Sequence, residues 1–424
     1  MRSVKITPSK LKGSVTVPPS KSMAHRAILC AALAKGISRI DNIAYSNDII
    51  ATIKAMESLG TKIIKNKDHL IIDGTTTYTK QDSLIDCVES GSTLRFMVPI
   101  SIVKENQIHF IGEGNLGKRP LNTFYEIFDR QNIDYSYQDN VLDLKIKGQL
   151  KADHYKIPGN ISSQFITGLL YALPLVAGDS VIEITSNLES KGYIDLTLQI
   201  LKTFGIEIIN ENYEQFIIKG NQNYVSNNLR VEADFSQAAF YLVAGAIGNE
   251  VVLKDLNLNS PQGDKVAIDI LKSMGAKIKS VEGNIQVVAN ELHGAIIDAS
   301  QCPDIIPVIS VACAIADGQS DIINAIRLRI KECDRIVATR QELNLLGANI
   351  TEYEDAMKVI GVENIDGTNV SSHDDHRIAM MLAIASTICQ KEIIIDNMDC
   401  VKKSYPNFWE DFVALGGKID VINV

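Results

Sequence analysis

The sequence predicts an α/β or α+β fold built from six similar units, and three observations support this prediction. Segments with helical and strand-like apolar periodicity alternate along the chain. Six times, a helix-like segment is followed by Gly or Asn, which tolerate the left-handed end of a helix, and then by a short strand-like run. These cap residues are Gly60, Asn132, Gly205, Gly275, Gly347 and Gly416, separated by 72, 73, 70, 72 and 69 residues. Solenoid repeats span only about 20–50 residues, so this longer period predicts small α/β subdomains rather than a rod.

The unit around Gly60 shows the order of elements most clearly. Residues 48–59 carry apolar side chains at a spacing of three to four, which predicts an amphipathic helix. Lys-Ile-Ile-Lys at 62–65 and Leu-Ile-Ile-Asp at 70–73, separated by polar residues, predict a hairpin. Six units of equal rank divide most naturally into two groups of three. We expect the chain to cross between the groups at 17–20 and again at 225–230.

Length and composition exclude several classes of protein. With 424 residues, 46% apolar and 22% charged, the chain is long enough for more than one domain and is not a disordered segment. It carries 42 Lys and Arg against 51 Asp and Glu, a net charge of −9, so no global positive field attracts nucleic acid or an anionic membrane. Any anion site must therefore be a local basic cluster.

Cysteine usage and the lack of long apolar stretches predict a cytoplasmic protein. The seven cysteines are scattered and form no C-x-x-C pair, which suits reduced thiols better than a disulfide framework or a zinc site. The amino-terminal residues lack the apolar core of a secretory signal. The longest apolar stretches, around 238–247 and 378–388, are shorter than the roughly 18–20 residues that a membrane span needs.

Three segments combine a turn with a polar helix start, where free backbone N–H groups and the helix dipole favour an anion. The first, at 18–34, contains Ser20, Lys21, Ser22 and Arg26. The second, at 89–96, has Gly91, which permits close approach of a ligand to the backbone. The third, at 159–170, has Ser162, Ser163 and Gln164. Ordinary helix capping is the alternative interpretation of the first and third segments, and a plain turn is that of the second.

The loop at 112–120 resembles a nucleotide phosphate loop, because Gly112 and Gly117-Lys118 have the required spacing. That motif needs Ser or Thr next, to hold magnesium, but Arg119 follows instead. We therefore interpret Arg119 as a ligand for phosphate or carboxylate, and Pro120 as the first residue of the next helix.

Three further segments carry charged residues near predicted helix starts. Residues 326–336 alternate apolar and charged side chains, which predicts a strand leading into a helix, with Lys331, Glu332 and Arg335 at the junction or on a solvated face. His373 and His376 have the spacing of a metal-ligating pair, but no third ligand is evident, and we expect His376 and Arg377 to face a ligand instead. Lys403 precedes a short helix.

Taken together, these segments resemble the enolpyruvyl transferase family over essentially the full chain. In chain order the motifs are Ser-Lys-Ser at 20–22 with Arg26, the turn at Gly91, Lys-Arg-Pro at 118–120, Ser-Ser-Gln at 162–164, Ser-Lys-Gly-Tyr at 190–193, Pro-Asp at 303–304, Lys-Glu-Cys-Asp-Arg at 331–335, Asp-His-Arg at 375–377 and Lys-Ser-Tyr-Pro at 403–406. Each motif is weak alone, but the ordered set is specific.

The resemblance implies a two-domain inside-out barrel of six βαβαββ repeats, three in each domain. One domain would comprise 1–18 and 228–424, the other 19–227, with the active site in the cleft between them. The implied reaction adds the 5-hydroxyl of shikimate 3-phosphate to C2 of phosphoenolpyruvate, protonates C3 and eliminates phosphate. These two small molecules are the expected partners. The resemblance implies neither a metal nor an organic cofactor, and we expect a monomer.

The resemblance also implies a role for each candidate residue. The shikimate 3-phosphate contacts would be Lys21, Ser22, Arg26, Ser162, Ser163, Gln164, Ser190, Asp304 and Lys331. The phosphoenolpyruvate contacts would be Lys21, Gly91, Arg119, Gln164, Arg335, Arg377 and Lys403. Asp304 is the expected base, and Glu332, sharing the work with Lys21, is the expected acid. Both substrates carry a phosphate and a carboxylate, which planar Arg groups and helix amino ends are suited to bind.

Three alternative functions make different predictions. UDP-N-acetylglucosamine enolpyruvyl transferase has the same fold, but that branch has Lys-Asn at the first motif and Cys in the loop near 110–120; here Ser22 follows Lys21 and the loop has no Cys. A P-loop NTPase predicts ATP hydrolysis that depends on Lys118. A non-catalytic repeat protein predicts that replacing Lys21, Glu332 or Arg377 by Ala changes no activity.

Overall fold

A computed structural model describes residues 2–80 and 82–423. The chain divides into two compact units, here called unit 1 (Met1–Pro18 with Glu232–Val424) and unit 2 (Pro19–Val231). The chain passes between the units next to Pro18 and Val231, whereas the sequence-based domain limits lie after residues 18 and 227. The described chain contains six four-stranded sheets.

Unit 2 contains three sheets, each with the same strand order. The elements are α1 (Lys21–Leu33), β3 (Ile37–Asp41), α2 (Asn47–Ser58), β4 (Lys62–Lys65), β5 (His69–Asp73) and β14 (Leu229–Arg230); β6 (Ser83–Asp86), α3 (Gly91–Ser101), β7 (Asn106–Ile111), α4 (Asn122–Gln131), β8 (Asp134–Ser136) and β9 (Asp143–Gly148); and β10 (His154–Ile157), α5 (Ser163–Ala172), β11 (Ser180–Ile184), α6 (Lys191–Thr203), β12 (Ile208–Glu211) and β13 (Gln215–Ile218). Their orders are β14-β3-β5-β4, β6-β7-β9-β8 and β10-β11-β13-β12.

Unit 1 repeats the arrangement. Its elements are β2 (Lys12–Thr16), α7 (Phe235–Ala246), β15 (Glu250–Lys254), α8 (Ala267–Ser273), β16 (Lys277–Val281) and β17 (Asn284–Val288); β18 (Ile296–Asp298), α9 (Ile306–Ala314), β19 (Gln319–Ile323), α10 (Arg335–Leu345), β20 (Asn349–Glu352) and β21 (Met357–Ile360); and β22 (Asn369–Val370), α11 (His376–Ala385), β23 (Ile393–Ile395), α12 (Phe408–Ala414), β24 (Lys418–Asn423) and β1 (Arg2–Thr7). Short 3₁₀ turns include Gly263–Val266, Ile326–Ile330 and Met398–Lys403.

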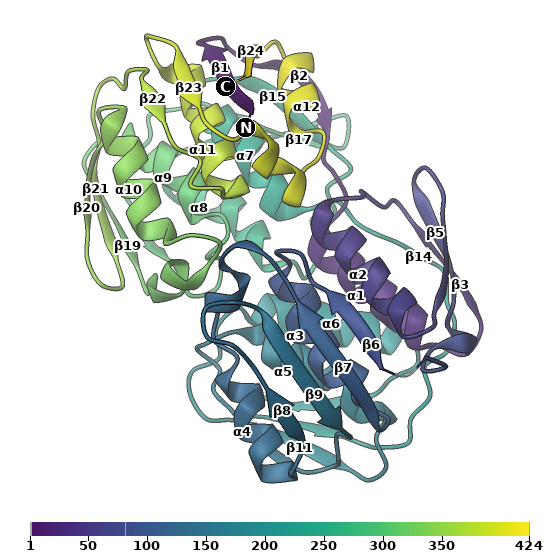
Figure 1. Ribbon diagram of the computed structural model, residues 1–424. Coiled ribbons are helices and arrows are strands. Elements are labelled where there is room, and N and C mark those ends of the chain that lie inside the picture. The colour runs from purple at the N-terminus through teal and green to yellow at the C-terminus, as the bar shows by residue number, and fades with distance from the viewer. Residues whose placement is uncertain (1, 81, 424) are drawn as a thin grey trace. The chain divides into compact units, whose positions relative to one another are not determined.

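Each sheet has the strand pattern of a βαβαββ repeat, and in two sheets the first strand comes from a distant part of the chain, because β14 pairs with β3 and β2 pairs with β15. In the sheet of β6 to β9, β6 and β7 pair in parallel across α3, whereas β7 with β9 and β8 with β9 are antiparallel. One sheet closes with a strand from the other end of the chain, because β1 pairs antiparallel with both β23 and β24. Figure 1 shows this pairing where the purple β1 lies beside the yellow β24.

The two helices of a repeat differ in burial. In α7, α9 and α11 every residue is buried, and α1, α3 and α5 are buried almost throughout. In α2, α4 and α6 only part of each helix is buried, as expected for an amphipathic helix on a sheet. The first helix of each repeat therefore forms the apolar core of its unit. The polar residues at its amino end are placed by that core.

The six predicted helix caps are confirmed. Gly60, Asn132, Gly205, Gly275, Gly347 and Gly416 all have positive φ, between 53° and 105°. Each follows a helix and closes it with the same pair of hydrogen bonds; at the first cap, Gly60 N donates to Glu57 O and Thr61 N to Met56 O. The amphipathic helix near 48–59 and the hairpin of 62–65 with 70–73 are also confirmed, as α2, β4 and β5.

Two of these caps predict different sensitivities to an added methyl group. Gly347→Ala is expected to cost about 1 kcal/mol, because φ is 98° and the nearest atom to a Cβ is Asn364 O at 4.0 Å. Gly60→Ala should cost more, because a Cβ there would lie 2.6 Å from the Thr76 carbonyl oxygen. Urea unfolding followed by circular dichroism measures both losses. Equal losses would mean that the Thr76 contact plays no part.

Two local predictions are wrong. Residues 326–330 form a 3₁₀ turn rather than a strand, because β19 has already ended at Ile323 and the Arg329 guanidinium donates to Tyr353 O and Glu354 O. Pro120 is not the first residue of a helix, since α4 begins at Asn122. No helix in the described ranges combines the length and apolarity that crossing a bilayer requires.

Candidate active site

The amino end of α1 presents the first predicted cluster. Ser20 caps the helix, and its Oγ accepts a hydrogen bond from Met23 N at 3.3 Å. Lys21 Nζ donates to Asp48 Oδ2 at 2.7 Å, with 16% of the lysine side chain exposed. The Ser22 carbonyl accepts from Arg26 Nη1 at 2.8 Å. Ser20 is therefore a capping residue, and Lys21 is a largely buried ammonium held by one carboxylate at a helix start.

Arg26 is more deeply buried than its expected role suggests. Its Nε donates to Thr197 Oγ1 at 2.8 Å and its Nη2 to Tyr193 O at 3.0 Å, and burial lowers its pKa. These bonds connect α1 to the first two turns of α6, which Ser190 precedes. Ser190 is fully buried and adopts a left-handed conformation with φ of 56°. Such strain in a residue other than glycine is frequent at ligand sites.

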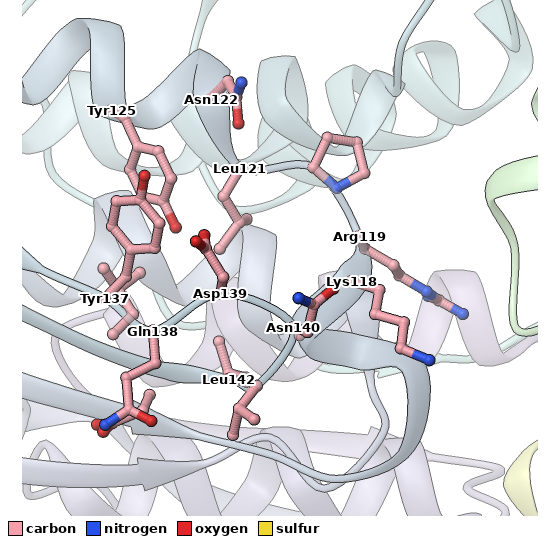
Figure 2. Close-up of a pocket in the computed structure, with 15 residues that line it drawn as sticks. Lys118, Arg119, Leu121, Asn122, Tyr125, Tyr137, Gln138, Asp139, Asn140 and Leu142 are labelled. Atoms are coloured by element: carbon pink, nitrogen blue, oxygen red, sulfur yellow. The ribbon is translucent and has the colours of Figure 1, made fainter.

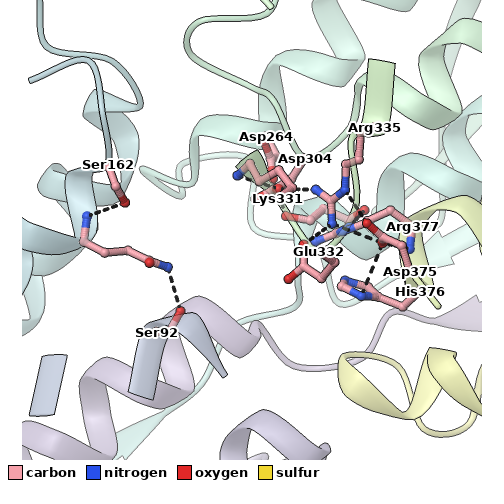
Figure 3. Close-up of polar contacts among 12 residues, drawn as sticks. Ser92, Ser162, Asp264, Asp304, Lys331, Glu332, Arg335, Asp375, His376 and Arg377 are labelled. Atoms are coloured by element: carbon pink, nitrogen blue, oxygen red, sulfur yellow. Dashed lines mark hydrogen bonds and ion pairs between the residues drawn. The ribbon is translucent and has the colours of Figure 1, made fainter. Parts of the chain in front are cut away.

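The starts of α3 and α5 are joined through Gln164. Gln164 Nε2 donates to Ser92 Oγ at 2.9 Å, and Gln164 Oε1 accepts from Arg95 Nη1 at 2.9 Å. Ser162 caps α5 by accepting from Gln164 N at 3.3 Å (Figure 3). Neither Ser92 nor Arg95 is among the residues predicted from the sequence. The available signal was that Arg95 is the only charged residue within the apolar segment Gly91–Ser101.

Arg119 reaches the amino end of α3. A Cβ at Gly91 would lie 2.5 Å from Arg119 Nη1, so glycine leaves room here for the guanidinium. The loop also borders a pocket of about 380 Å³ next to Tyr125 and Tyr137, whose rings stack 4.6 Å apart. Figure 2 shows the side chains of Lys118 and Arg119 extending to the side away from these rings. The geometry therefore assigns Arg119 to the α3 helix start rather than to the tyrosine pocket.

A buried series of hydrogen bonds between side chains connects α1 with the start of α3. His25 Nδ1 and Thr52 Oγ1 are 2.7 Å apart, Thr52 Oγ1 and Thr93 Oγ1 are 2.7 Å apart, and Thr93 donates to Ser90 Oγ at 2.8 Å. Burial lowers the pKa of His25 to about 3, against the attraction of Asp48. His25 is therefore neutral in the folded protein near neutral pH.

This buried histidine predicts an acid-sensitive fold. Stability should fall as the pH drops from about 6.5 towards 3, because unfolding allows His25 to bind a proton that the folded state excludes. One such proton changes the free energy of unfolding by about 1.4 kcal/mol per pH unit. His25→Gln should therefore show a weaker pH dependence than wild type in urea titrations at about pH 5 and about pH 7. Parallel pH dependences would contradict this role.

Unit 1 gathers three carboxylates around one arginine. Arg335 Nη1 donates to Asp304 Oδ1 at 2.8 Å, Nη2 to Glu332 Oε2 at 2.7 Å and Nε to Asp375 Oδ2 at 2.7 Å (Figure 3). The Arg335 side chain is 1% exposed. Burial opposes its charge, but Asp375, Glu332 and Asp304 outweigh burial and hold its pKa well above the usual value. The guanidinium thus fixes the positions of two expected proton-transfer groups.

Asp304 lies in a strongly positive environment. Burial disfavours its ionised form, but Lys331, Arg335 and Arg377 outweigh burial and hold its pKa well below the usual range. Lys331 Nζ donates to Asp304 Oδ1 at 3.1 Å. Asp304 is therefore ionised at neutral pH and able to accept a proton.

Arg377 and Lys403 complete the cationic side of this cluster. Asp375 caps α11 by accepting from Arg377 N at 2.8 Å, and Arg377 Nη1 donates to Ser236 O at 3.0 Å. Lys403 Nζ lies 3.8 Å from Glu332 Oε1, with 7% of its side chain exposed. The six expected residues of unit 1 therefore lie in one cluster: Asp304, Lys331, Glu332, Arg335, Arg377 and Lys403.

The two histidines of the 373–376 segment make separate contacts. His373 Nε2 is 2.7 Å from Glu342 Oε1, whereas His376 Nδ1 is 3.6 Å from Asp375 Oδ1. Within residues 2–80 and 82–423, no set of three His, Cys, Asp or Glu side chains is arranged to hold a metal ion.

Known proteins resemble this chain in sequence and in fold. A family model for EPSP synthase (3-phosphoshikimate 1-carboxyvinyltransferase) matches residues 6–412. The 3-phosphoshikimate 1-carboxyvinyltransferase of Clostridium perfringens (strain 13 / Type A) is 59% identical over 419 residues, which cover 98% of this chain and 99% of the relative. That of Clostridioides difficile (strain 630) is 56% identical over 437 residues, covering 100% of each. The structure of EPSP synthase from Acinetobacter baumannii covers 100% of both chains with a TM-score of 0.82 and 26% identity. The chain therefore belongs to the EPSP synthase family.

Proposed function

We propose that this chain transfers the enolpyruvyl group of phosphoenolpyruvate to the 5-hydroxyl of shikimate 3-phosphate and releases phosphate, a step of the shikimate pathway to the aromatic amino acids. Full-length identity of 50–59% to curated 3-phosphoshikimate 1-carboxyvinyltransferases supports the reaction. The observation that carries the chemistry is the cluster in which Asp304 and Glu332 share the buried guanidinium of Arg335. It offers two carboxylates for proton transfer next to cations that suit an anionic substrate.

The proposed binding residues are those that the family resemblance implies. For shikimate 3-phosphate the proposed contacts are Lys21, Ser22, Arg26, Ser162, Ser163, Gln164, Ser190, Asp304 and Lys331. For phosphoenolpyruvate they are Lys21, Gly91, Arg119, Gln164, Arg335, Arg377 and Lys403. Three helix starts in unit 2, each capped by Ser20, Ser90 or Ser162, add partial positive charge that suits a phosphate.

The proton steps follow from the charges in unit 1. Asp304 takes the proton of the 5-hydroxyl while the oxygen of that hydroxyl bonds to C2 of phosphoenolpyruvate. Glu332, together with Lys21, delivers a proton to C3. Arg335 and Lys403, which both contact Glu332, are the cations proposed to bind phosphoenolpyruvate, so Glu332 lies next to the proposed substrate. Loss of a proton from C3 and departure of phosphate from C2 then restore the double bond in the product.

Phosphate release tests this function directly. The protein mixed with both substrates in the presence of a metal chelator should release phosphate, and either substrate alone should not. Release from ATP that Lys118→Ala abolishes would support the NTPase alternative instead, while absence of release with both substrates would overturn the proposal.

Three further expectations belong to the same proposal: the enzyme acts as a monomer, in the cytoplasm, and without a nucleic-acid partner. The net charge of −9 supports the last of these. Light scattering coupled to size-exclusion chromatography tests the first, since a monomer elutes with a mass of 46.6 kDa.

A further inference from the structure

Asp264 lies next to the cluster of unit 1 but has no place in the proposed chemistry. It belongs to the 3₁₀ turn Gly263–Val266 and is 3% exposed. Ser236 Oγ donates a hydrogen bond to Asp264 Oδ2. The carbonyl oxygen of the same Ser236 accepts from Arg377 Nη1 at 3.0 Å. Asp264 is thus connected to a proposed phosphoenolpyruvate contact through a single residue.

The first turn of α7, which contains Ser236, is held on several sides. Asp234 caps the helix by accepting from Gln237 N at 3.1 Å. Gln262 Oε1 accepts from Phe235 N at 3.2 Å, and its Nε2 donates to Ala233 O at 2.8 Å. These bonds hold the residues on either side of Ser236, and the Asp264 contact holds the side chain of Ser236 itself.

Asp264 also interacts electrostatically with the active cluster. Burial raises its pKa to about 6, Asp304 and Asp234 act in the same direction, and the Ser236 hydrogen bond and Arg377 oppose them. Figure 3 shows the Asp264 side chain next to Asp304. A buried carboxyl in this environment is costly, and such a cost points to a role beyond packing.

We propose that Asp264 is a positioning residue for phosphoenolpyruvate binding: by holding Ser236 it fixes the carbonyl that orients the Arg377 guanidinium. The proposal rests on the function assigned above, in which Arg377 contacts phosphoenolpyruvate. The guanidinium also packs against the face of Phe240, 5.9 Å from the ring centre. A planar donor group binds a carboxylate or phosphate well only in the correct orientation.

Steady-state kinetics with four variants tests this role. Asp264→Ala and Ser236→Ala should each raise the KM for phosphoenolpyruvate by about 10-fold, as expected for one weakened charged hydrogen bond, with a smaller change in kcat. Asp264→Asn keeps an oxygen that can accept from Ser236 and should recover most of the affinity. The double variant Asp264→Ala/Ser236→Ala should be no worse than either single variant, because both break the same contact. The dissociation constant of shikimate 3-phosphate should not change.

A control separates this contact from a general loss of stability. Asp411 accepts from Tyr405 Oη at 2.7 Å, and burial also raises its pKa, so Asp411→Asn removes a comparable carboxylate from unit 1. That variant should leave the KM for phosphoenolpyruvate unchanged. An unchanged KM in both Ser236→Ala and Asp264→Ala, or additive effects in the double variant, would overturn the role of Asp264. An unchanged KM in Arg377→Met would instead overturn the assignment of Arg377.

Discussion

Asp304→Asn is expected to lower kcat by about 10²–10⁴-fold, the usual contribution of a general base. The amide keeps the shape of the side chain and one oxygen for Lys331 and Arg335, but it cannot take the proton of the attacking hydroxyl. In the wild-type protein, Lys331 and Arg335 hold the Asp304 pKa well below its usual range against the effect of burial, so the base is ionised throughout the neutral range. Phosphate release under saturating substrates measures this loss.

Substrate binding separates this effect from misfolding. Titration calorimetry should show that Asp304→Asn still binds shikimate 3-phosphate. Asp321→Asn is a suitable control, because Asp321 lies on β19 and accepts from Gln319 Nε2 at 2.9 Å, outside the active cluster. Its kcat should equal that of wild type. A kcat of Asp304→Asn that is also close to wild type would exclude Asp304 as the base.

Arg335→Ala is expected to produce the largest loss of stability. It leaves Asp304, Glu332 and Asp375 without their shared cation in a buried site, and breaking such a buried pair costs about 3–5 kcal/mol. The loss should be greater at about pH 8 than at about pH 5, because acid allows the uncompensated carboxylates to take up protons. Activity should be lost as well, since Glu332 and Asp304 are both oriented by this guanidinium.

The single tryptophan allows the unfolding of unit 1, which contains Arg335, to be measured. Trp409 is the only tryptophan in the sequence; it lies in unit 1, and its Nε1 donates to Met398 O at 2.9 Å. Urea unfolding followed by its fluorescence therefore reports on unit 1. Arg340→Ala is the matched control, because Arg340 lies on the same helix and pairs with Glu352 at 3.4 Å in a partly exposed contact. An Arg335→Ala transition at the wild-type urea concentration would show that the carboxylates need no shared cation.

Features encoded by consecutive residues could be predicted from the sequence. The caps at Gly60 and Asn132 were predicted because a left-handed helix end needs Gly or Asn, and the serine caps of α1, α3 and α5 are equally local. The resemblance to the enolpyruvyl transferase family is confirmed by the family match, and the inside-out α/β fold by the structural match. The individual roles of the site residues stay a proposal.

Features that join distant parts of the chain could not be predicted. The pairing of β1 with β23 and β24 follows from no local pattern. The contact between Arg95 and Gln164 spans 69 residues, and that between Arg335 and Asp375 spans 40. The alternation of apolar and charged residues at 326–330 predicts a strand, but this segment forms a 3₁₀ turn. So short a pattern does not distinguish a turn from a strand. No local sequence pattern singles out Asp264, because its neighbours Ser236 and Arg377 belong to the distant helices α7 and α11.

Affinity for shikimate 3-phosphate, measured by titration calorimetry on two lysine variants, tests the central proposal most directly. Lys21 belongs to unit 2 and Lys331 to unit 1, and both are assigned to this one substrate. Each loses a charged hydrogen bond on replacement, so Lys21→Met and Lys331→Met should each weaken binding by about 10-fold or more. If either variant binds shikimate 3-phosphate as tightly as wild type, that lysine does not contact this substrate, and the proposed set of binding residues is wrong.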